Sequence, residues 1–189
     1  MAQEYEVQIT DINPEEIQEK LRKIGAAEEK DCFQKRWIFD IKCLNSDDPG
    51  RGEWIRLREK NGKATLTYKN KKSKGISDTE EIEVGVDDFE KVKEILSKID
   101  SFQGKYYQEN KKKIFKLPGI EFSIDSWPMI PPFLEIEGES EASVKKGLKL
   151  LGFEGDDYGH PGLLDIYKKY GIDLHSIEEL TFSIFYFKN

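Results

Sequence analysis

The sequence predicts an α+β fold, in which eight antiparallel strands form a barrel with a polar interior and helices pack on the outside. Three observations predict this fold. Several segments alternate charged and apolar side chains, as strands with one polar and one apolar face do. Many charged residues come in pairs two positions apart, such as Arg56 and Arg58. Other segments have the apolar spacing of amphipathic helices, which would cover the apolar outer faces of the strands.

Eight segments have the strand pattern, and they include a clear hairpin at Asn61-Gly62, because both central positions of a type I′ turn need a positive φ. The strands are expected at residues 3–10, 33–43, 53–60, 63–71, 78–84, 105–116, 120–127 and 132–139. Helices are expected after the cap at Asn13 and after Asp87, and at about residues 141–151 and 162–170. The tail from Ile177 to Phe187 fits both a helix and a strand, and we assign it as helical.

Bulk composition limits the classes of protein that the chain can belong to. Its 189 residues fit a single domain spanning 1–189, with 37% hydrophobic and 35% charged residues. A net charge of −7 argues against general binding to nucleic acid or to an anionic membrane, since both need a positive surface. The N-terminus has no signal-peptide pattern, and no stretch is long enough to cross a bilayer, so we expect a cytoplasmic protein.

The charged faces of the strands supply the candidate site. Carboxylates are the ligands that Mg²⁺ and Mn²⁺ prefer, and Arg and Lys bind phosphates. A plain antiparallel sheet with one solvated charged face would also explain any single strand, but the recurrence of the pattern in six segments favours a site. Enclosed charges must pair, hydrate or bind ions. The predicted inward residues are Glu4, Glu6, Gln8, Arg36, Arg56, Arg58, Lys69, Glu81, Glu83, Lys111, Lys113, Asp125, Glu135, Glu137 and Glu139.

Other chemical motifs are missing from the sequence. It has no glycine-rich phosphate loop, no P-loop and no GxSxG elbow. Neither histidine has an acid or a nucleophile at motif spacing, so we assign both to surface or packing roles. The two cysteines indicate neither a zinc site nor a disulfide framework.

The ordered set of motifs resembles the CYTH superfamily, also called triphosphate tunnel metalloenzymes. This superfamily includes class IV adenylyl cyclases, thiamine triphosphatases and inorganic triphosphatases. The resemblance covers most of the chain, and the order and spacing of the motifs together make it specific. Its motifs appear here as Glu4-Tyr5-Glu6-Val7-Gln8, Arg56-Leu57-Arg58, Leu66-Thr67-Tyr68-Lys69, Glu80-Glu81-Ile82-Glu83, Lys111 to Lys113, Ser123-Ile124-Asp125 and Glu135-Ile136-Glu137.

The resemblance implies a closed eight-stranded antiparallel tunnel that binds a triphosphate together with Mg²⁺ or Mn²⁺. By matched position, it implies that Glu4, Glu6, Glu135 and Glu137 are metal ligands. It implies phosphate contacts for Arg56, Arg58, Lys69, Lys111 and Lys113, with Gln8 also near the phosphates. Lys69 and Asp125 become the candidate catalytic residues, with Asp125 supporting a metal or its water. Arg36, Glu81 and Glu83 would line the rest of the tunnel.

Gln8 departs from the family pattern, which usually has lysine at that position. Glutamine keeps hydrogen bonding but loses a positive charge beside the phosphate, so turnover or substrate choice is expected to differ. Our first interpretation is a metal-dependent phosphohydrolase acting on inorganic triphosphate, thiamine triphosphate or a nucleoside triphosphate. One alternative is a class IV adenylyl cyclase, and another is a binding protein with weakened chemistry. A homodimer is compatible with the sequence, although no feature decides it.

Overall fold

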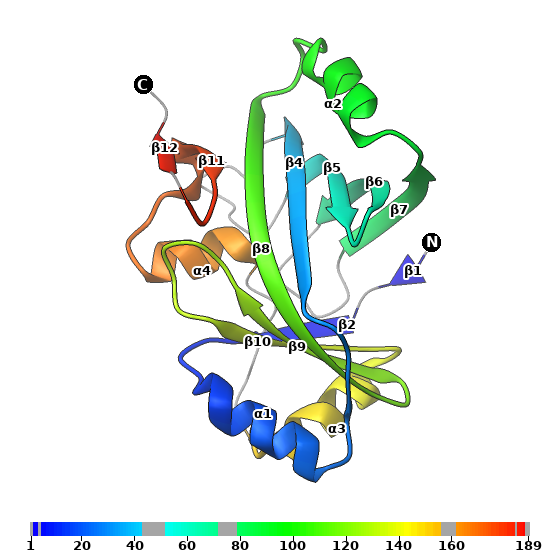
Figure 1. Cartoon of the computed structure of the whole chain (residues 1–189), viewed down its shortest axis with the longest axis vertical. Helices are drawn as coiled ribbons and strands as arrows, with labels where there is room; N and C mark the ends of the chain where they lie inside the picture. The colour runs from blue at the N-terminus through cyan, green and yellow to red at the C-terminus, as the bar shows by residue number, and fades with distance from the viewer. Residues whose placement is uncertain are drawn as a thin grey trace.

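The protein is an α+β fold built on one strongly curled sheet, as Figure 1 shows. The computed structural model describes residues 2–3, 5–42, 52–71, 79–155, 162–183 and 185–187. The strands are β1 (Ala2–Gln3), β2 (Tyr5–Ile9), β3 (Ala27–Glu28), β4 (Cys32–Lys42), β5 (Gly52–Lys60), β6 (Lys63–Lys71), β7 (Thr79–Val86), β8 (Gly104–Leu117), β9 (Ile120–Ser126), β10 (Phe133–Gly138), β11 (Ile177–Leu180) and β12 (Phe185–Phe187). The predicted fold class is therefore confirmed as α+β with a curled, antiparallel main sheet.

The two edge strands of the main sheet, β1 and β2, follow each other at the N-terminus of the chain. Along the sheet the order is β1-β7-β6-β5-β4-β8-β9-β10-β2, and every pairing on this path is antiparallel. β1 pairs with β7, where Ala2 lies opposite Glu81, while β2 pairs with β10, where Glu6 lies opposite Glu137. Closure of the barrel between β1 and β2 depends on Glu4, which lies outside the described residues, so closure stays a prediction.

Local sequence explains where the helices begin and end. They are α1 (Pro14–Lys23), α2 (Phe89–Ser97), α3 (Glu141–Leu151), α4 (Leu163–Lys169) and the 3₁₀ turn η1 (Leu174–Ser176). The Asn13 side chain accepts hydrogen bonds from two backbone N–H groups of the first turn of α1, and the Ser140 hydroxyl accepts one from the Ser143 N–H at the start of α3. Gly152 ends α3 with a φ of 82°, a conformation in which glycine carries no steric penalty.

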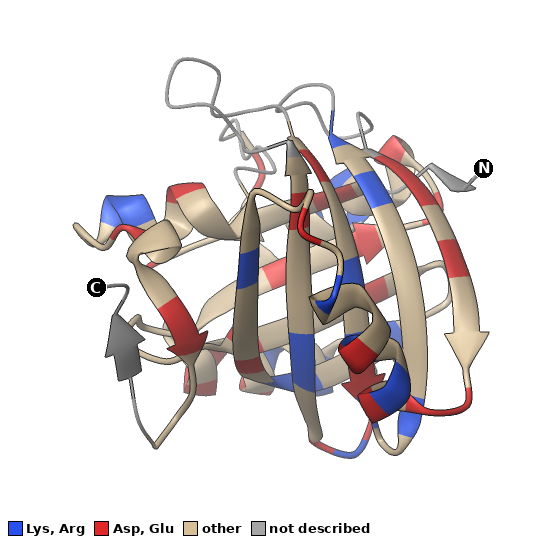
Figure 2. Cartoon of the chain, turned by 90° about the horizontal axis from the view of Figure 1, so that it is seen from above, with Lys and Arg blue, Asp and Glu red and all other residues tan. Residues whose placement is uncertain are grey.

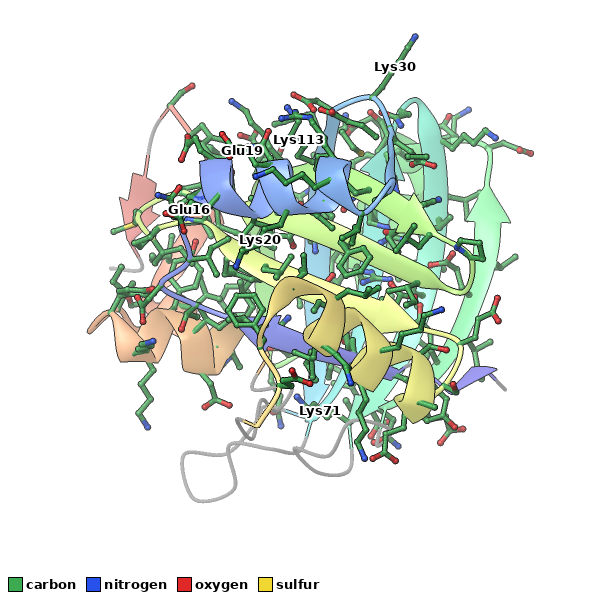
Figure 3. The ribbon with its side chains drawn as sticks, turned by 90° about the horizontal axis from the view of Figure 1, so that it is seen from below. Glu16, Glu19, Lys20, Lys30, Lys71 and Lys113 are labelled. Carbon is green, nitrogen blue, oxygen red and sulfur yellow. The ribbon has the colours of Figure 1, made fainter. Side chains whose placement is uncertain are left out.

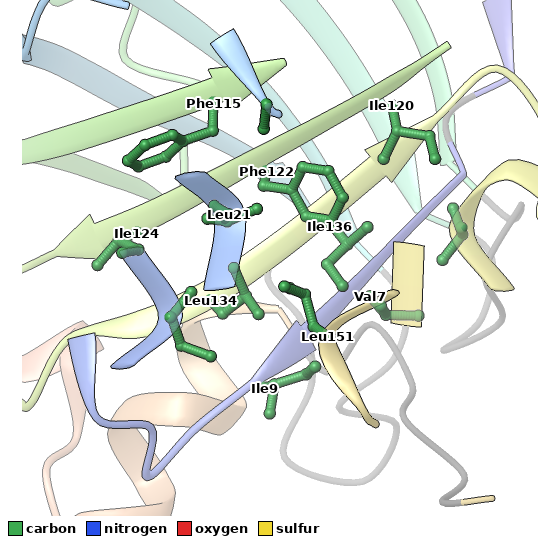
Figure 4. Close-up of a cluster of buried hydrophobic side chains, with 13 residues drawn as sticks. Val7, Ile9, Leu21, Phe115, Ile120, Phe122, Ile124, Leu134, Ile136 and Leu151 are labelled. Atoms are coloured by element: carbon green, nitrogen blue, oxygen red, sulfur yellow. The ribbon is translucent and has the colours of Figure 1, made fainter. Parts of the chain in front are cut away.

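Helices α1 and α3 cover the outer, apolar face of the sheet (Figure 3). Their buried side chains form one cluster with residues of β2, β8, β9 and β10, which Figure 4 shows in close-up. Phe122, Leu134 and Ile136 are fully buried in this cluster. A second cluster joins α2 to the outer faces of β4 and β5 through Phe39, Leu57 and neighbouring side chains. Because the apolar side chains face outwards to the helices, the concave face of the sheet is left to the polar ones.

The C-terminal tail differs from the sequence prediction. Residues after η1 form β11 and β12 rather than a helix, and β11 pairs in parallel with β8. The prediction of a helix at Ile177 to Phe187 is wrong, because Ile177 and Leu180 are anchored in an apolar cluster and the intervening backbone bonds to a neighbouring strand. Within the described part of the chain, no helix has the length and apolar character needed to cross a membrane.

The close packing around Gly147 in α3 predicts that a larger side chain at this position will destabilise the protein. A Cβ at this position of α3 would lie 2.7 Å from Cγ2 of Ile136, which is fully buried and has no room to shift. Gly147→Ala is therefore expected to lower the free energy of unfolding by about 1–3 kcal/mol, even though alanine favours a helix more than glycine does. Urea unfolding would measure the change. Exposed Lys146→Ala in the same helix is the control, and equal stability of the two variants would contradict the tight contact.

Candidate functional site in the concave face of the sheet

A cavity of about 480 Å³ lies in the concave face of the sheet. This volume is in the range of about 300–1,000 Å³ that is typical of small-molecule sites. Figure 2 shows charged positions recurring along the strands that surround it. The predicted site residues that line it are Glu6, Gln8, Arg36, Arg56, Arg58, Lys69, Glu81, Glu83, Asp125, Glu135 and Glu137.

Strand β7 holds the cations of β5 and β6 in place. Glu81 lies 2.8 Å from Nζ of Lys69 and 3.3 Å from the guanidinium of Arg56. Glu83 lies 3.4 Å from Arg58 and 3.6 Å from Arg56. In the part of the chain that the structure describes, the three cations Arg56, Arg58 and Lys69 are thus held in place by the two carboxylates of β7. Arg56 and Lys69 are only 13% and 11% exposed, so water screens their charges weakly.

Lys112 forms the centre of a second buried group on β8, β9 and β10. Its Nζ lies 2.6 Å from Glu135 and 3.2 Å from Asp125, and it donates to the Ser123 hydroxyl. Burial disfavours the charged ammonium of Lys112, but the carboxylates of Asp125 and Glu135 outweigh this effect and raise its pKa. Burial also raises the pKa of Asp125 to about 7, although Lys112 acts in the opposite direction. Lys112 therefore keeps two otherwise costly carboxylates in the cavity wall.

Arg36 is a buried cation in the wall of the cavity. It is 8% exposed, it donates to the Asn110 side chain, and it stacks over Trp127 at 4.8 Å from the ring centroid. No carboxylate of the described residues lies within ion-pair distance of Arg36. Burial, followed by the positive charges of Arg56 and Arg58, lowers the pKa of Arg36. The guanidinium nevertheless remains charged at neutral pH, so this part of the cavity is strongly attractive to an anion.

Carboxylates also gather where β2 pairs with β10. Glu6 lies across from Glu137 in the strand register, and both line the cavity with Glu135. Burial and the charges of Glu135, Glu6 and Glu121 raise the pKa of Glu137. Among the described residues no three acidic, histidine or cysteine side chains already converge on one metal position. Glu4, the fourth predicted ligand, lies outside the described residues.

Two of the predicted phosphate contacts point away from the cavity. Lys111 is exposed and lies over the Phe182 ring, and Lys113 pairs with Glu28 on the outer surface, where Figure 3 shows it beside α1. The prediction that both face inwards is wrong, because the strand register directs Lys112 into the cavity instead. Three consecutive lysines show no alternation of charged and apolar residues, so their own segment does not identify the one that faces inwards. The pairing of Lys112 with the inward-facing Asp125 of β9 identifies it.

The Gln8 side chain forms hydrogen bonds at the cavity with β10 and with the residue that precedes α4. Its side-chain amide donates to Glu135 at 3.0 Å, and its carbonyl oxygen accepts from the Gly162 backbone N–H at 3.2 Å. Lysine could donate to Glu135 but could not accept from Gly162. Gln8 therefore has a structural partner that explains why an amide suits this position.

Several cavity residues were not predicted from the sequence. Some are residues on predicted strands. Others come from the C-terminal segment, and the sequence did not indicate where this segment packs against the sheet. His175, assigned above to a surface or packing role, is among the lining residues. The lining residues that were missed include Gln34, Asp40, Lys60, Lys71, Tyr106, Gln108, Lys112, Trp127, Gly162, Leu163, Leu164, Leu174 and His175.

A curled antiparallel sheet with a charged concave face defines the class to which the protein belongs. The family model of the CYTH domain matches residues 2–154, and the chain belongs to this family. The resemblance read from the sequence motifs is therefore confirmed.

Known proteins with similar sequences or folds agree with this assignment. A putative adenylate cyclase from Methanocaldococcus jannaschii is 35% identical over 135 residues, which cover 71% of this chain and 74% of that protein. A solved structure of a Pyrococcus horikoshii protein is 26% identical, with a TM-score of 0.66 over 85% of this chain and 96% of that one. A putative adenylyl cyclase from Hippeastrum, described as having a dominant triphosphatase activity, shares the fold at 16% identity, with a TM-score of 0.53 over 90% of this chain and 96% of its own.

Replacing Lys112 should show how much it stabilises the protein by pairing with Asp125 and Glu135. Lys112→Met is expected to lower the free energy of unfolding by about 3 kcal/mol or more at pH 8, because two buried carboxylates lose their partner. The loss should shrink as the pH falls towards 5. A carboxyl group whose pKa is raised in the folded state takes up protons preferentially in that state, so acid restores stability. Chemical unfolding at several pH values would measure this dependence.

Lys111→Met is the matched control for this experiment, since the neighbouring lysine faces outwards. We expect it to change stability by no more than about 0.5 kcal/mol at either pH. Similar losses in both variants, or a Lys112→Met loss that grows as the pH falls, would contradict the described pairing.

Substitution of Gln8 should loosen the C-terminal segment. Gln8→Lys removes the acceptor for the Gly162 N–H, so amide hydrogen exchange in α4 is expected to become faster, with a stability loss of about 0.5–1.5 kcal/mol. Gln8→Glu keeps an acceptor oxygen and should leave exchange in α4 slower than in Gln8→Lys. Exchange measured by mass spectrometry would compare them. The same fast exchange in both variants would show that the carbonyl oxygen does not hold the segment.

Proposed function

We propose that this protein is a metal-dependent phosphohydrolase that binds a triphosphate in the concave cavity and cleaves it. The observation that carries this proposal is the buried guanidinium of Arg36, which has no carboxylate partner among the described residues and lies in the field of Arg56 and Arg58. Such an arrangement is costly in the empty protein and is relieved by a polyanion. A triphosphate has enough charge to reach several cations of the cavity at once.

The cations would divide the work between binding and catalysis. Arg56 and Arg58 present planar groups that suit bidentate contacts with phosphate oxygens. Lys69, held by Glu81, would stabilise charge on the transferring phosphoryl group. Lys112 replaces Lys111 and Lys113 as the inward lysine of β8, and Asp125 would fix its position.

The carboxylates on β2 and β10 fit a divalent metal in their chemistry. They offer only oxygen ligands, as Mg²⁺ and Mn²⁺ prefer, and burial together with the charges of the neighbouring carboxylates raises the pKa of Glu137. Glu6, Glu135 and Glu137, together with Glu4, would hold the ion. When bound, the ion would polarise a phosphoryl oxygen or a water molecule. The side chains would hold the triphosphate between the metal side and the cationic side of the cavity.

An adenylyl cyclase is the second candidate, and the name of the archaeal relative favours it. The same cavity would then place the α-phosphate of ATP, rather than a terminal phosphate, next to the nucleophile. The Hippeastrum protein shows that this fold accommodates triphosphatase activity in a protein named for cyclisation. The third interpretation, a binding protein without efficient turnover, was suggested by Gln8, but the hydrogen bond from Gly162 gives that residue a different role.

A substrate panel would distinguish these functions. Inorganic triphosphate, thiamine triphosphate and ATP would be incubated with Mg²⁺ or Mn²⁺, and phosphate, pyrophosphate and cyclic AMP would be measured. Hydrolysis gives phosphate and a diphosphate, whereas cyclisation gives cyclic AMP and pyrophosphate. Metal-dependent binding without any product would support the binding protein. The absence of both binding and turnover with every triphosphate would contradict the proposal.

Arg36→Met should separate ligand binding from folding. The dissociation constant of the triphosphate is expected to rise at least tenfold, about 1.4 kcal/mol, because one buried charge is lost. The free energy of unfolding without ligand should stay the same or increase, since the variant removes a buried charge that two arginines repel. Calorimetry and urea unfolding would measure the two effects. Exposed Arg22→Met is the control, and a stability loss without an affinity loss would make Arg36 a structural residue.

A further inference from the structure

Three amide side chains lie next to the Arg36 guanidinium on strands β4 and β8. Nη2 of Arg36 donates to Oε1 of Gln34 at 3.0 Å and to Oδ1 of Asn110. In the strand register Gln34 lies opposite Asn110, and Gln108 lies opposite Arg36. All three amides are buried. The neighbours of this cation on its own strand and on β8 are therefore neutral hydrogen-bonding groups.

The other cations of the cavity described above have carboxylate partners instead. Carboxylates of β7 hold the cations of β5 and β6, and Lys112 contacts both Asp125 and Glu135. Asp125 and Glu135 also raise the pKa of Arg36, but burial and the neighbouring arginines lower it more. An aspartate at position 110 would have almost the same shape as Asn110 and would accept more strongly from a guanidinium. Space alone therefore does not explain the amide.

Asparagine at position 110 leaves hydrogen-bonding groups without partners in the empty protein. Arg36 has only donors, so the carbonyl oxygen of Asn110 must face it. The amide nitrogen of Asn110 is then buried without an acceptor among the described residues, and so is Nε of Arg36. Buried donors without partners lower stability. A carboxylate at position 110 would remove one such donor and pair with the guanidinium, so the amide indicates a role other than stability.

We propose that Asn110 and Gln34 are positioning residues, which hold Arg36 with neutral acceptors and so leave its charge available to the triphosphate. This proposal rests on the proposed function of the same site. Arg36 and Gln34 line the cavity, whereas Asn110 is not among the described lining residues, so Asn110 acts through Arg36. A carboxylate at either position would pair with the guanidinium before the ligand binds, and the triphosphate would have to compete with it.

The test replaces an amide by the acid of the same shape. The ligand is diimidotriphosphate with Mg²⁺, because its P–N–P links resist hydrolysis during calorimetry. Asn110→Asp is expected to raise its dissociation constant by about tenfold, since the guanidinium is then already paired. The urea midpoint of the protein without ligand should stay the same or rise. A merely structural residue would instead lose stability on substitution.

A second measurement shows whether Asn110 acts through Arg36. In the Arg36→Met background, Asn110→Asp introduces a buried carboxylate with no guanidinium beside it, so the urea midpoint should fall. The same substitution should leave the midpoint unchanged or raise it when Arg36 is present. An equal change of the midpoint in both backgrounds would overturn the proposal, because the two side chains would then be independent.

Gln18→Glu is the matched control, because Gln18 of α1 also accepts from an arginine, Arg22, but at an exposed position. It adds the same negative charge, and the dissociation constant should change by less than about twofold, since water and salt screen that charge. Gln34→Glu makes the test change at the second acceptor of Arg36 and should raise the dissociation constant in the same way. It keeps the proposal testable if circular dichroism shows that Asn110→Asp does not fold.

The possible failures can be told apart. If the unmodified protein binds diimidotriphosphate and the folded acid variants bind it equally well, the positioning role is overturned while the proposed function stands. If neither acid variant folds, the positioning role is also overturned, because a carboxylate beside Arg36 is expected to be stabilising or neutral. If the unmodified protein binds no triphosphate in the presence of metal, the proposed function fails and the positioning role fails with it.

Discussion

The structure depends on the need to neutralise charged side chains on the inside of a curled sheet. Helices α1, α2 and α3 bury apolar side chains of the outer face, so the inner face receives most of the charged side chains that pair inside the sheet. Glu81 and Glu83 then fix the cations of β5 and β6, and Lys112 fixes Asp125 and Glu135. The two groups lie on different parts of the sheet. The interior thus has one part in which arginine and lysine side chains of β5 and β6 gather and another in which carboxylates of β2, β9 and β10 gather.

Alternation in the sequence was sufficient to predict most of the fold and most of the charged side chains that line the cavity. It succeeded where charged and apolar residues strictly alternate, as in Arg56-Leu57-Arg58 and Glu135-Ile136-Glu137. It failed at Lys111 to Lys113, where every position is charged and the inward residue is set by pairing with β9. Register with a distant strand is a tertiary property, so the local pattern could not choose between the neighbours.

The C-terminal segment shows a second limit of sequence reasoning. Ile177 to Phe187 satisfies a helical and a strand spacing equally well, and the contacts of β11 with β8 decide between them. The role of His175 in the cavity could not be inferred either, because its neighbours Asp40 and Tyr106 lie far away in sequence. Secondary-structure propensity depends on neighbouring residues in the sequence, so it does not predict contacts between distant segments.

The pairing of β2 with β10 has a consequence for how the chain folds. Gln8 and Glu135, which meet in this pairing, are separated by 127 positions in sequence, whereas β5 and β6 are joined by a tight turn. Because contacts between distant segments form slowly, we expect the hairpin that carries the arginines to form first and the carboxylate side to join late. The interior charges would then remain hydrated for most of the folding reaction, and they would lose water only when the last strand pairs.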